Sequence, residues 1–199
     1  MRLKRSFYNR DTVTVARELL GKYLVRKIPS ASSGQAAKII KVRITETEAY
    51  CGQKDKACHA SKGLTPRTKI MFGPPGHAYV YMIYGMYHCL NFVTRKEACP
   101  EAVLIRSAEL GNYALRITDY KKNSQSAIRN SLMNSKLNGP GKLCRELKID
   151  GKLNGVDIIK SKELWVEDDN AVTAKIKKGK RIGVDYAGSY KNKPWRFWI

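Results

Sequence analysis

The clearest pattern in the chain is the alternation of apolar and polar residues from Lys38 to Tyr50. A strand turns successive side chains to opposite faces, so this alternation predicts one strand with one apolar face. The residues on that face are Ile40, Val42, Ile44, Glu46, Glu48 and Tyr50. Burying a carboxylate costs several kcal/mol unless it is paired. Two glutamates on this face therefore indicate either a functional site or a strand that leaves the core at Thr45 and exposes its acids to water.

Two further elements are predicted before this strand. Asp11 is a suitable N-cap, and Gly21 a suitable C-terminal residue, for a helix over about residues 12–20. Residues 22–28 read as a strand, and residues 29–37 form a polar loop of small residues. We expect the two strands to pair in antiparallel fashion.

A hairpin is predicted after the long irregular segment of residues 51–77. Residues 77–94 are rich in aromatic and β-branched side chains, with Gly85 near their middle. This pattern predicts two strands that turn around Tyr84, Gly85 and Met86. Residues 102–106 place apolar side chains on both faces of a strand, which favours a central position in the sheet.

The fold class follows from these elements together. Helices are predicted over residues 111–121, 125–133 and 142–148, and neither an internal repeat nor a linker divides the chain. A chain of 199 residues can bury enough surface to fold without a metal or a disulfide. We expect one mixed α+β domain over residues 1–199, with a mainly antiparallel curved sheet, flanking helices and a protruding β-hairpin.

The charge of the chain points to a polyanionic partner. Lysine and arginine number 38 against 17 acidic residues, which gives a formal net charge of +21. Self-repulsion on this scale disfavours a compact state unless a polyanion binds, so nucleic acid is the leading candidate. A membrane surface and structural RNA are the alternatives, although no basic amphipathic helix stands out. A basic run predicts a DNA-facing rim or a solvated face, and it comprises Lys175, Lys177, Lys178, Lys180 and Arg181.

The N-terminal sequence and the cysteines favour a soluble cytoplasmic protein, associated with the nucleoid in a bacterium. No signal-like or membrane-spanning apolar run is present. The five cysteines are odd in number and lack a C-x-x-C pair, which is typical of reduced thiols. The alternative is a zinc site formed by Cys51, Cys58 and His59, but the spacing of these residues matches no common zinc pattern. We expect no metal and no cofactor.

A set of short motifs runs in order through nearly the whole chain. They are Glu46-Thr47-Glu48-Ala49-Tyr50, His59, Thr65-Pro66-Arg67, Met71-Phe72, Tyr79-Val80-Tyr81, Tyr84-Gly85-Met86, Asn91, residues 103–106, residues 138–144, Arg181-Ile182-Gly183 and residues 194–197. Together they closely resemble the alkyladenine (3-methyladenine) DNA glycosylase family. The combined spacing is specific, whereas ETEAY or GPGK alone would be a weak signal.

The resemblance implies a monofunctional base-excision enzyme that acts as a monomer on double-stranded DNA containing damaged purines. Such an enzyme hydrolyses the N-glycosidic bond of a flipped-out alkylated purine and leaves an abasic site. The implied bases are 3-methyladenine and 7-methylguanine, with hypoxanthine and ethenoadenine as further candidates. By the same resemblance Glu48 activates the attacking water and Arg106 helps to hold it. A carboxylate suits this role because it takes the proton of the water and stabilises positive charge on the sugar.

The resemblance also implies a base pocket. Tyr50, His59 and Tyr81 would surround the damaged base, and Asn91 would limit entry of guanine by crowding its exocyclic amine. Cation–π attraction of about 0.5 to 2 kcal/mol would favour a cationic alkylated base over a neutral one.

The remaining candidates are contacts to the DNA itself. Tyr84 adjoins Gly85 at the predicted turn, where a large ring has no core to enter, so it is expected to intercalate, with Met86 nearby. Lys142 follows a glycine-proline turn at a helix start, which favours a phosphate, and Arg67 is a second candidate for a phosphate contact.

Several alternatives stay open on the sequence alone. His59 could be an ordinary loop histidine, and Arg106 could bind a phosphate instead of the water. The many lysines permit a Schiff-base lyase, and the glycine-proline turn is also found in helix-hairpin-helix glycosylases. A nucleic-acid binder that has lost catalysis is the non-enzymatic alternative. Thr68 and Ser107 stand where asparagine and alanine are common, which leaves the range of lesions open.

Overall fold

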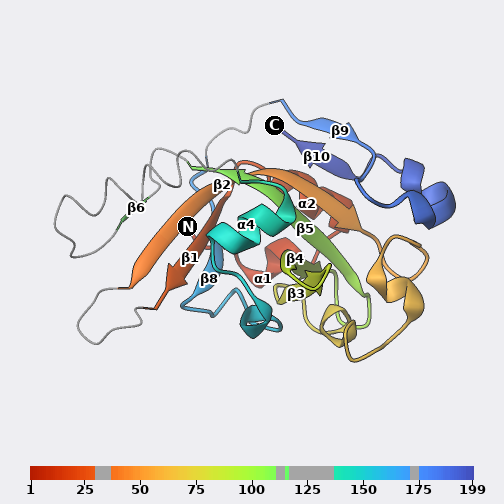
Figure 1. Ribbon diagram of the computed structural model, residues 1–199, viewed down its shortest axis with the longest axis horizontal. Coiled ribbons are helices and arrows are strands. Elements are labelled where there is room, and N and C mark those ends of the chain that lie inside the picture. The colour runs from red at the N-terminus through yellow and green to blue at the C-terminus, as the bar shows by residue number, and fades with distance from the viewer. Residues whose placement is uncertain (30–36, 111–114, 117–136, 171–174) are drawn as a thin grey trace.

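Strand β2 (Lys38–Tyr50) runs through the middle of one antiparallel sheet (Figure 1). The computed structural model describes residues 1–29, 37–110, 115–116, 137–170 and 175–199. One edge of β2 pairs with β1 (Tyr23–Ile28) and then with β10 (Arg196–Trp198). The other edge pairs with β6 (Leu115–Arg116) and then with β5 (Glu101–Glu109). The predicted strand is confirmed with the expected bounds.

The sheet continues outward on both sides of this centre. Its order is β3 (Ala78–Ile83), β4 (Tyr87–Thr94), β5, β2, β1 and β8 (Leu164–Glu167). Two short strands extend it, because β7 (Leu137–Asn138) pairs with β5 and β9 (Lys177–Gly179) pairs with β10. The expected mixed α+β fold with a curled antiparallel sheet is therefore confirmed, as is the hairpin of β3 and β4.

Short helices flank the sheet. They are α1 (Arg5–Tyr8), α2 (Thr12–Glu18) and α4 (Pro140–Glu146), with the 3₁₀ helices η1 (His59–Lys62), η2 (Lys69–Phe72), η3 (Gly151–Leu153) and η4 (Asp185–Asn192). Helix α2 begins as predicted, because the Asp11 side chain accepts a hydrogen bond from the Thr14 N–H. Its buried residues Val15 and Ala16 belong to the main hydrophobic core. The helix predicted over 142–148 is confirmed as α4, which begins and ends two residues earlier than predicted.

One predicted helix is wrong where the structure describes it. Leu115 and Arg116 form strand β6, which pairs with Ile40 and Ile39 of β2. The edge of β2 presents backbone N–H and C=O groups that need partners, and a short strand satisfies them where a helix could not. The rest of the predicted helix over 111–121, the helix over 125–133 and most of the loop over 29–37 lie outside the described residues.

The alternation of β2 changes phase near its middle, which corrects the sequence prediction. Up to Ile44 the even-numbered residues face the core, but beyond it Thr47 and Ala49 do so. The cause is the register against β5, which shifts between Ile44 and Glu46 and again between Glu46 and Thr47. Glu48 therefore lies on the face opposite the core. It is nonetheless fully buried, so the alternative of a water-exposed acid is also wrong for this residue.

Thr47 links this shifted strand to helix α2. Its hydroxyl donates a 2.7 Å hydrogen bond to the Ala16 carbonyl, a helix C-terminal acceptor in the buried core. We predict that Thr47→Val lowers the free energy of unfolding by about 1 to 3 kcal/mol, because the buried carbonyl loses its partner. Urea denaturation measures this change. Thr45→Val, at a partly exposed position of the same strand, is the matched control and should change it by less than about 0.5 kcal/mol. Equal effects of the two substitutions would contradict the assignment.

Candidate active site

A row of side chains crosses four neighbouring strands on the face opposite the core. Tyr79 of β3 pairs with Asn91 of β4, Asn91 with Leu104 of β5, and Leu104 with Glu48 of β2. Directly opposed residues in antiparallel strands place their side chains on the same face. The sheet therefore brings Glu48 into line with residues from the hairpin.

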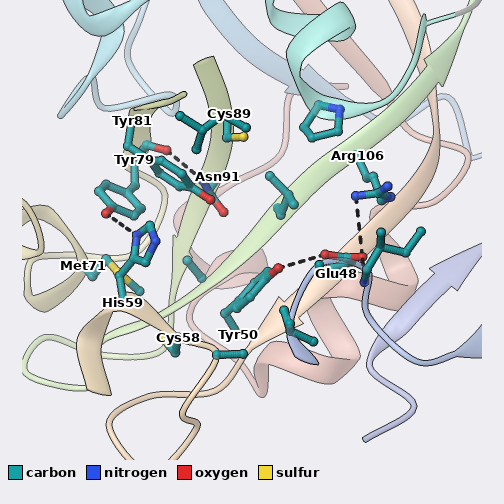
Figure 2. A pocket seen from close by; sticks show the side chains of 18 of the residues that line it. Glu48, Tyr50, Cys58, His59, Met71, Tyr79, Tyr81, Cys89, Asn91 and Arg106 are labelled. Atoms are coloured by element: carbon teal, nitrogen blue, oxygen red, sulfur yellow. Dashed lines mark hydrogen bonds and ion pairs between the residues drawn. The ribbon is translucent and has the colours of Figure 1, made fainter. Parts of the chain in front are cut away.

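This row forms the floor of a cavity of about 600 Å³, a size typical of small-molecule sites. Figure 2 shows the side chains that converge on it from the strands and from the long segment after β2. All the predicted site residues except Met86 and Lys142 line this cavity. They are Glu48, Tyr50, His59, Arg67, Tyr81, Tyr84, Asn91 and Arg106.

Glu48 is held by three groups from different parts of the chain. Its Oε2 accepts a 2.9 Å hydrogen bond from the Tyr50 hydroxyl, and its Oε1 accepts a 3.0 Å hydrogen bond from the Ile182 N–H. The Nη1 of Arg106 lies 3.8 Å from the same Oε1. These contacts, drawn as dashed lines for Tyr50 and Arg106 in Figure 2, fix the carboxylate at one end of the cavity.

The surroundings of Glu48 favour a proton acceptor. Burial raises the pKa of its carboxyl above the usual range, while Arg106, the Ile182 N–H and the Tyr50 hydroxyl oppose that rise. Burial and the neighbouring Glu48 in turn keep the pKa of Tyr50 well above its usual value, so its hydroxyl remains a donor. A carboxylate with a raised pKa is a stronger general base than one in water.

Aromatic side chains make the opposite wall. The rings of His59 and Tyr81 lie 4.5 Å apart between centroids, and those of Tyr79 and Tyr81 lie 5.2 Å apart. The Nδ1 of His59 is 2.9 Å from the Tyr79 hydroxyl, so both side chains are fixed. The amide of Asn91 donates a 3.1 Å hydrogen bond to the Tyr79 carbonyl, which orients it beside these rings. This wall can stack against a planar ring.

A family model described as methylpurine-DNA glycosylase (MPG) matches residues 6–199. The chain belongs to the methylpurine-DNA glycosylase family. It is thus a DNA glycosylase, a hydrolase of N-glycosidic bonds.

Full-length relatives agree with this membership. A protein of Methanocella arvoryzae is 52% identical over 198 residues, which cover 98% of this chain and 91% of the relative. Proteins of Desulfitobacterium hafniense and Clostridium perfringens strain 13 are 48% and 47% identical, covering this chain entirely and 95% and 96% of those relatives. All three carry the provisional name 3-methyladenine DNA glycosylase.

The hairpin tip of this family member is strongly exposed. Tyr84 is 86% and Met86 67% exposed. Tyr84 and Gly85 both have positive φ angles, 51° and 68°. For a bulky residue such as tyrosine this left-handed conformation costs about 1 to 2 kcal/mol, and it aims the ring outward at the cavity rim. Arg67 lies on the same rim, with its guanidinium carbon 5.0 Å from the centre of the Tyr81 ring.

Arg181 does not belong to the predicted basic rim. Its side chain is fully buried and forms a bidentate ion pair with Asp55, with nitrogen–oxygen distances of 2.5 and 2.8 Å. It also donates to the Ala49 carbonyl and lies 4.8 Å from the centre of the Tyr50 ring. This pair anchors the segment whose Ile182 N–H reaches Glu48. Sequence reasoning assigned no role to Asp55, because the segment around it has no periodicity to link it to a residue 126 positions away.

Lys142 lies on α4, outside the cavity. Its side chain is exposed, and its Nζ is 3.3 Å from the Asn138 Oδ1. Pro140 of the same helix does line the cavity, so Lys142 lies two residues along the chain from the cavity lining.

Nothing in the described part of the chain resembles a metal site. Across these residues no three His, Cys, Asp or Glu side chains are placed to hold an ion, and all five cysteines are free thiols. None of the described helices is long and apolar enough to cross a membrane.

The partly buried imidazole of His59 gives a testable prediction. Burial and the nearby Arg67 and Lys62 lower its pKa to about 4, so the ring is neutral at pH 7. In the unfolded chain the same imidazole has a pKa of about 6.5, so it takes up a proton at a higher pH than in the folded protein. We therefore expect the free energy of unfolding to fall as the pH drops from about 6.5 to 4. Denaturation at several pH values should show a smaller fall for His59→Gln. An imidazole that titrates near 6.5 by NMR in the native protein would contradict this.

Proposed function

We propose that the protein removes alkylated purines from duplex DNA by hydrolysis, with Glu48 as the base that activates water. The observation that carries this proposal is the fully buried Glu48 carboxylate at one end of a cavity with aromatic walls. A cavity of about 600 Å³ accommodates a purine and its sugar, which must leave the base stack to reach the acid.

The reaction follows from the position of Glu48. A water beside its carboxylate attacks the anomeric carbon of the flipped nucleotide, and the carboxylate takes a proton from that water. The carbon–nitrogen bond breaks with its electron pair going to the purine, which leaves as the free base. An alkyl group at N3 or N7 makes the purine cationic, so departure neutralises it. Glu48 also stabilises the positive charge that develops on the sugar.

Arg106 supports this step next to Glu48. Its Nη1 faces the carboxylate at 3.8 Å, and its side chain is mostly buried. A guanidinium donor at this place can hold the oxygen of the water while the carboxylate takes its proton.

Selectivity for a cationic base fits the aromatic wall. The rings of Tyr50, His59 and Tyr81 line the cavity, and cation–π attraction to such rings contributes about 0.5 to 2 kcal/mol. His59 adds no positive charge at neutral pH, because burial lowers its pKa to about 4. Excision of 3-methyladenine and 7-methylguanine follows from this chemistry. Asn91, whose amide donates to the Tyr79 carbonyl at the cavity floor, would crowd the exocyclic amine that guanine and 7-methylguanine share, so it would slow but not prevent excision of 7-methylguanine.

DNA contacts complete the proposal. Tyr84 fills the space left by the flipped nucleotide, with Met86 beside it, and Arg67 and Lys142 bind phosphates. The exposure of all four side chains supports these roles. Action as a monomer on damaged double-stranded DNA is part of the same proposal.

A lysine-based lyase fits the cavity less well. Among the described residues the cavity lining includes no lysine, whereas it includes the Glu48 carboxylate. Water is therefore the proposed nucleophile, and borohydride should trap no covalent adduct with DNA.

The Glu48→Gln variant tests the mechanism. It keeps the shape of the side chain but cannot accept a proton, so we expect release of 3-methyladenine from methylated DNA to fall at least about 100-fold. Binding to a duplex with an abasic site should remain, which separates catalysis from folding. Glu109→Gln is the matched control, because Glu109 is exposed and pairs with Arg43 away from the cavity. Base release by Glu48→Gln at the rate of the wild type would refute the mechanism.

The Tyr84→Ala variant tests the intercalation. Loss of stacking should weaken excision from duplex DNA by a factor that corresponds to about 1 to 3 kcal/mol. Excision from single-stranded DNA, where no gap must be filled, should change less. Tyr84→Phe keeps the ring and should behave like the wild type. If duplex and single-stranded rates fall together, Tyr84 does not fill the gap.

A further inference from the structure

Arg106 lies between two carboxylates and is closer to the one outside the cavity. Its Nε is 3.1 Å from the Glu46 Oε1, and its Nη1 is 3.8 Å from the Glu48 Oε1. The three side chains carry a net charge of −1 when both acids are ionised. Glu46 and Glu48 therefore share the positive charge of Arg106.

Glu46 is itself firmly held. The Ser107 hydroxyl donates a 2.8 Å hydrogen bond to its Oε2, and the Arg196 Nη1 lies 3.4 Å from its Oε1. Its side chain is only 18% exposed and borders a separate small cavity with Ser107 and Arg196. Glu46 does not line the cavity of Glu48, so it cannot touch a base bound there.

The irregular pairing of β2 with β5 creates this arrangement. Ile44 of β2 pairs with Ala108 of β5, Glu46 pairs with Ser107, and Thr47 pairs with Ile105. Arg106 is passed over in this register. Its guanidinium reaches both Glu46 and Glu48, which lie two positions apart on the same face of β2.

We propose that Glu46 is a positioning residue: it holds Arg106 through Nε so that Nη1 faces Glu48 and the water, and its charge offsets part of the charge of Arg106. This inference rests on the proposed role of Glu48. It assigns Glu46 a function in the reaction without contact to the substrate.

The electrostatic consequence has a definite sign. Burial and Glu46 raise the pKa of Glu48, whereas Arg106, the Ile182 N–H and Tyr50 lower it. The neighbouring Cys89 thiol of β4 stays neutral, because burial raises its pKa to about 11. Without the charge of Glu46, Arg106 acts on Glu48 unopposed. The pKa of Glu48 then falls, and Glu48 becomes a weaker base.

The test is the pH profile of Glu46→Gln. Single-turnover release of base from methylated duplex DNA is measured over about pH 4 to 9. We expect the acidic limb of the pH–rate profile to move to lower pH by about one unit. The rate on the plateau of the profile should fall about 10-fold. Arg106→Gln should move the limb in the opposite direction, because the cation is removed. A purely structural role of Glu46 would lower the rate at every pH without moving the limb.

Two milder variants separate charge from position. Glu46→Asp keeps the charge but shortens the reach to Arg106, so we expect the limb near its original pH and a lower plateau. Ser107→Ala removes the hydrogen bond to the Glu46 Oε2 and should lower the plateau less than Glu46→Gln does. If Glu46→Gln does not fold, a plateau for Glu46→Asp equal to that of the wild type overturns the inference.

The outcomes distinguish this inference from the proposed function. An unmoved limb in a folded Glu46→Gln, with Glu48→Gln inactive, overturns the role of Glu46 and leaves Glu48 as the base. Base release by Glu48→Gln at the wild-type rate overturns the proposed function itself.

Discussion

The cost of burying the Glu48 carboxylate is the constraint on which the structure of the site depends. An ionised acid without water is unfavourable by several kcal/mol unless hydrogen bonds and opposite charge replace its hydration. Three groups do so, namely the Tyr50 hydroxyl, the Ile182 N–H and the Arg106 guanidinium. They come from three distant parts of the chain, so the site exists only when all of these parts are in place. The remaining imbalance keeps the pKa of Glu48 raised.

Two of these three supports, the Ile182 N–H and Arg106, have anchors of their own. The Ile182 N–H is fixed because Arg181 next to it is buried against Asp55 and the Tyr50 ring. Arg106 is fixed by Glu46. The buried Arg181–Asp55 pair is costly to desolvate and costly to break, which suits an element that must adopt a single position. Ion pairs therefore hold the end of the cavity that carries Glu48.

The opposite end of the cavity has a different character. Tyr84 at the hairpin tip is almost fully exposed and has a left-handed backbone conformation. Between the two ends lies the wall of His59 and Tyr81, which is aromatic and uncharged at neutral pH. The molecule thus combines a buried acid, a stacking surface and an exposed aromatic tip along one face of a curved sheet. This arrangement agrees with membership of a DNA glycosylase family.

The sequence by itself determined β1 to β5, including the hairpin, and eight of the residues that line the cavity, because periodicity and turn residues are local signals and motif spacing is read directly. It could not determine which face of β2 carries Glu48, since a shift in pairing with β5 reverses the alternation after Ile44. It also misplaced Arg181 on the surface. Only the tertiary structure brought Arg181 to Asp55 and Glu46 to Arg106, because contacts between remote segments leave no pattern along the chain.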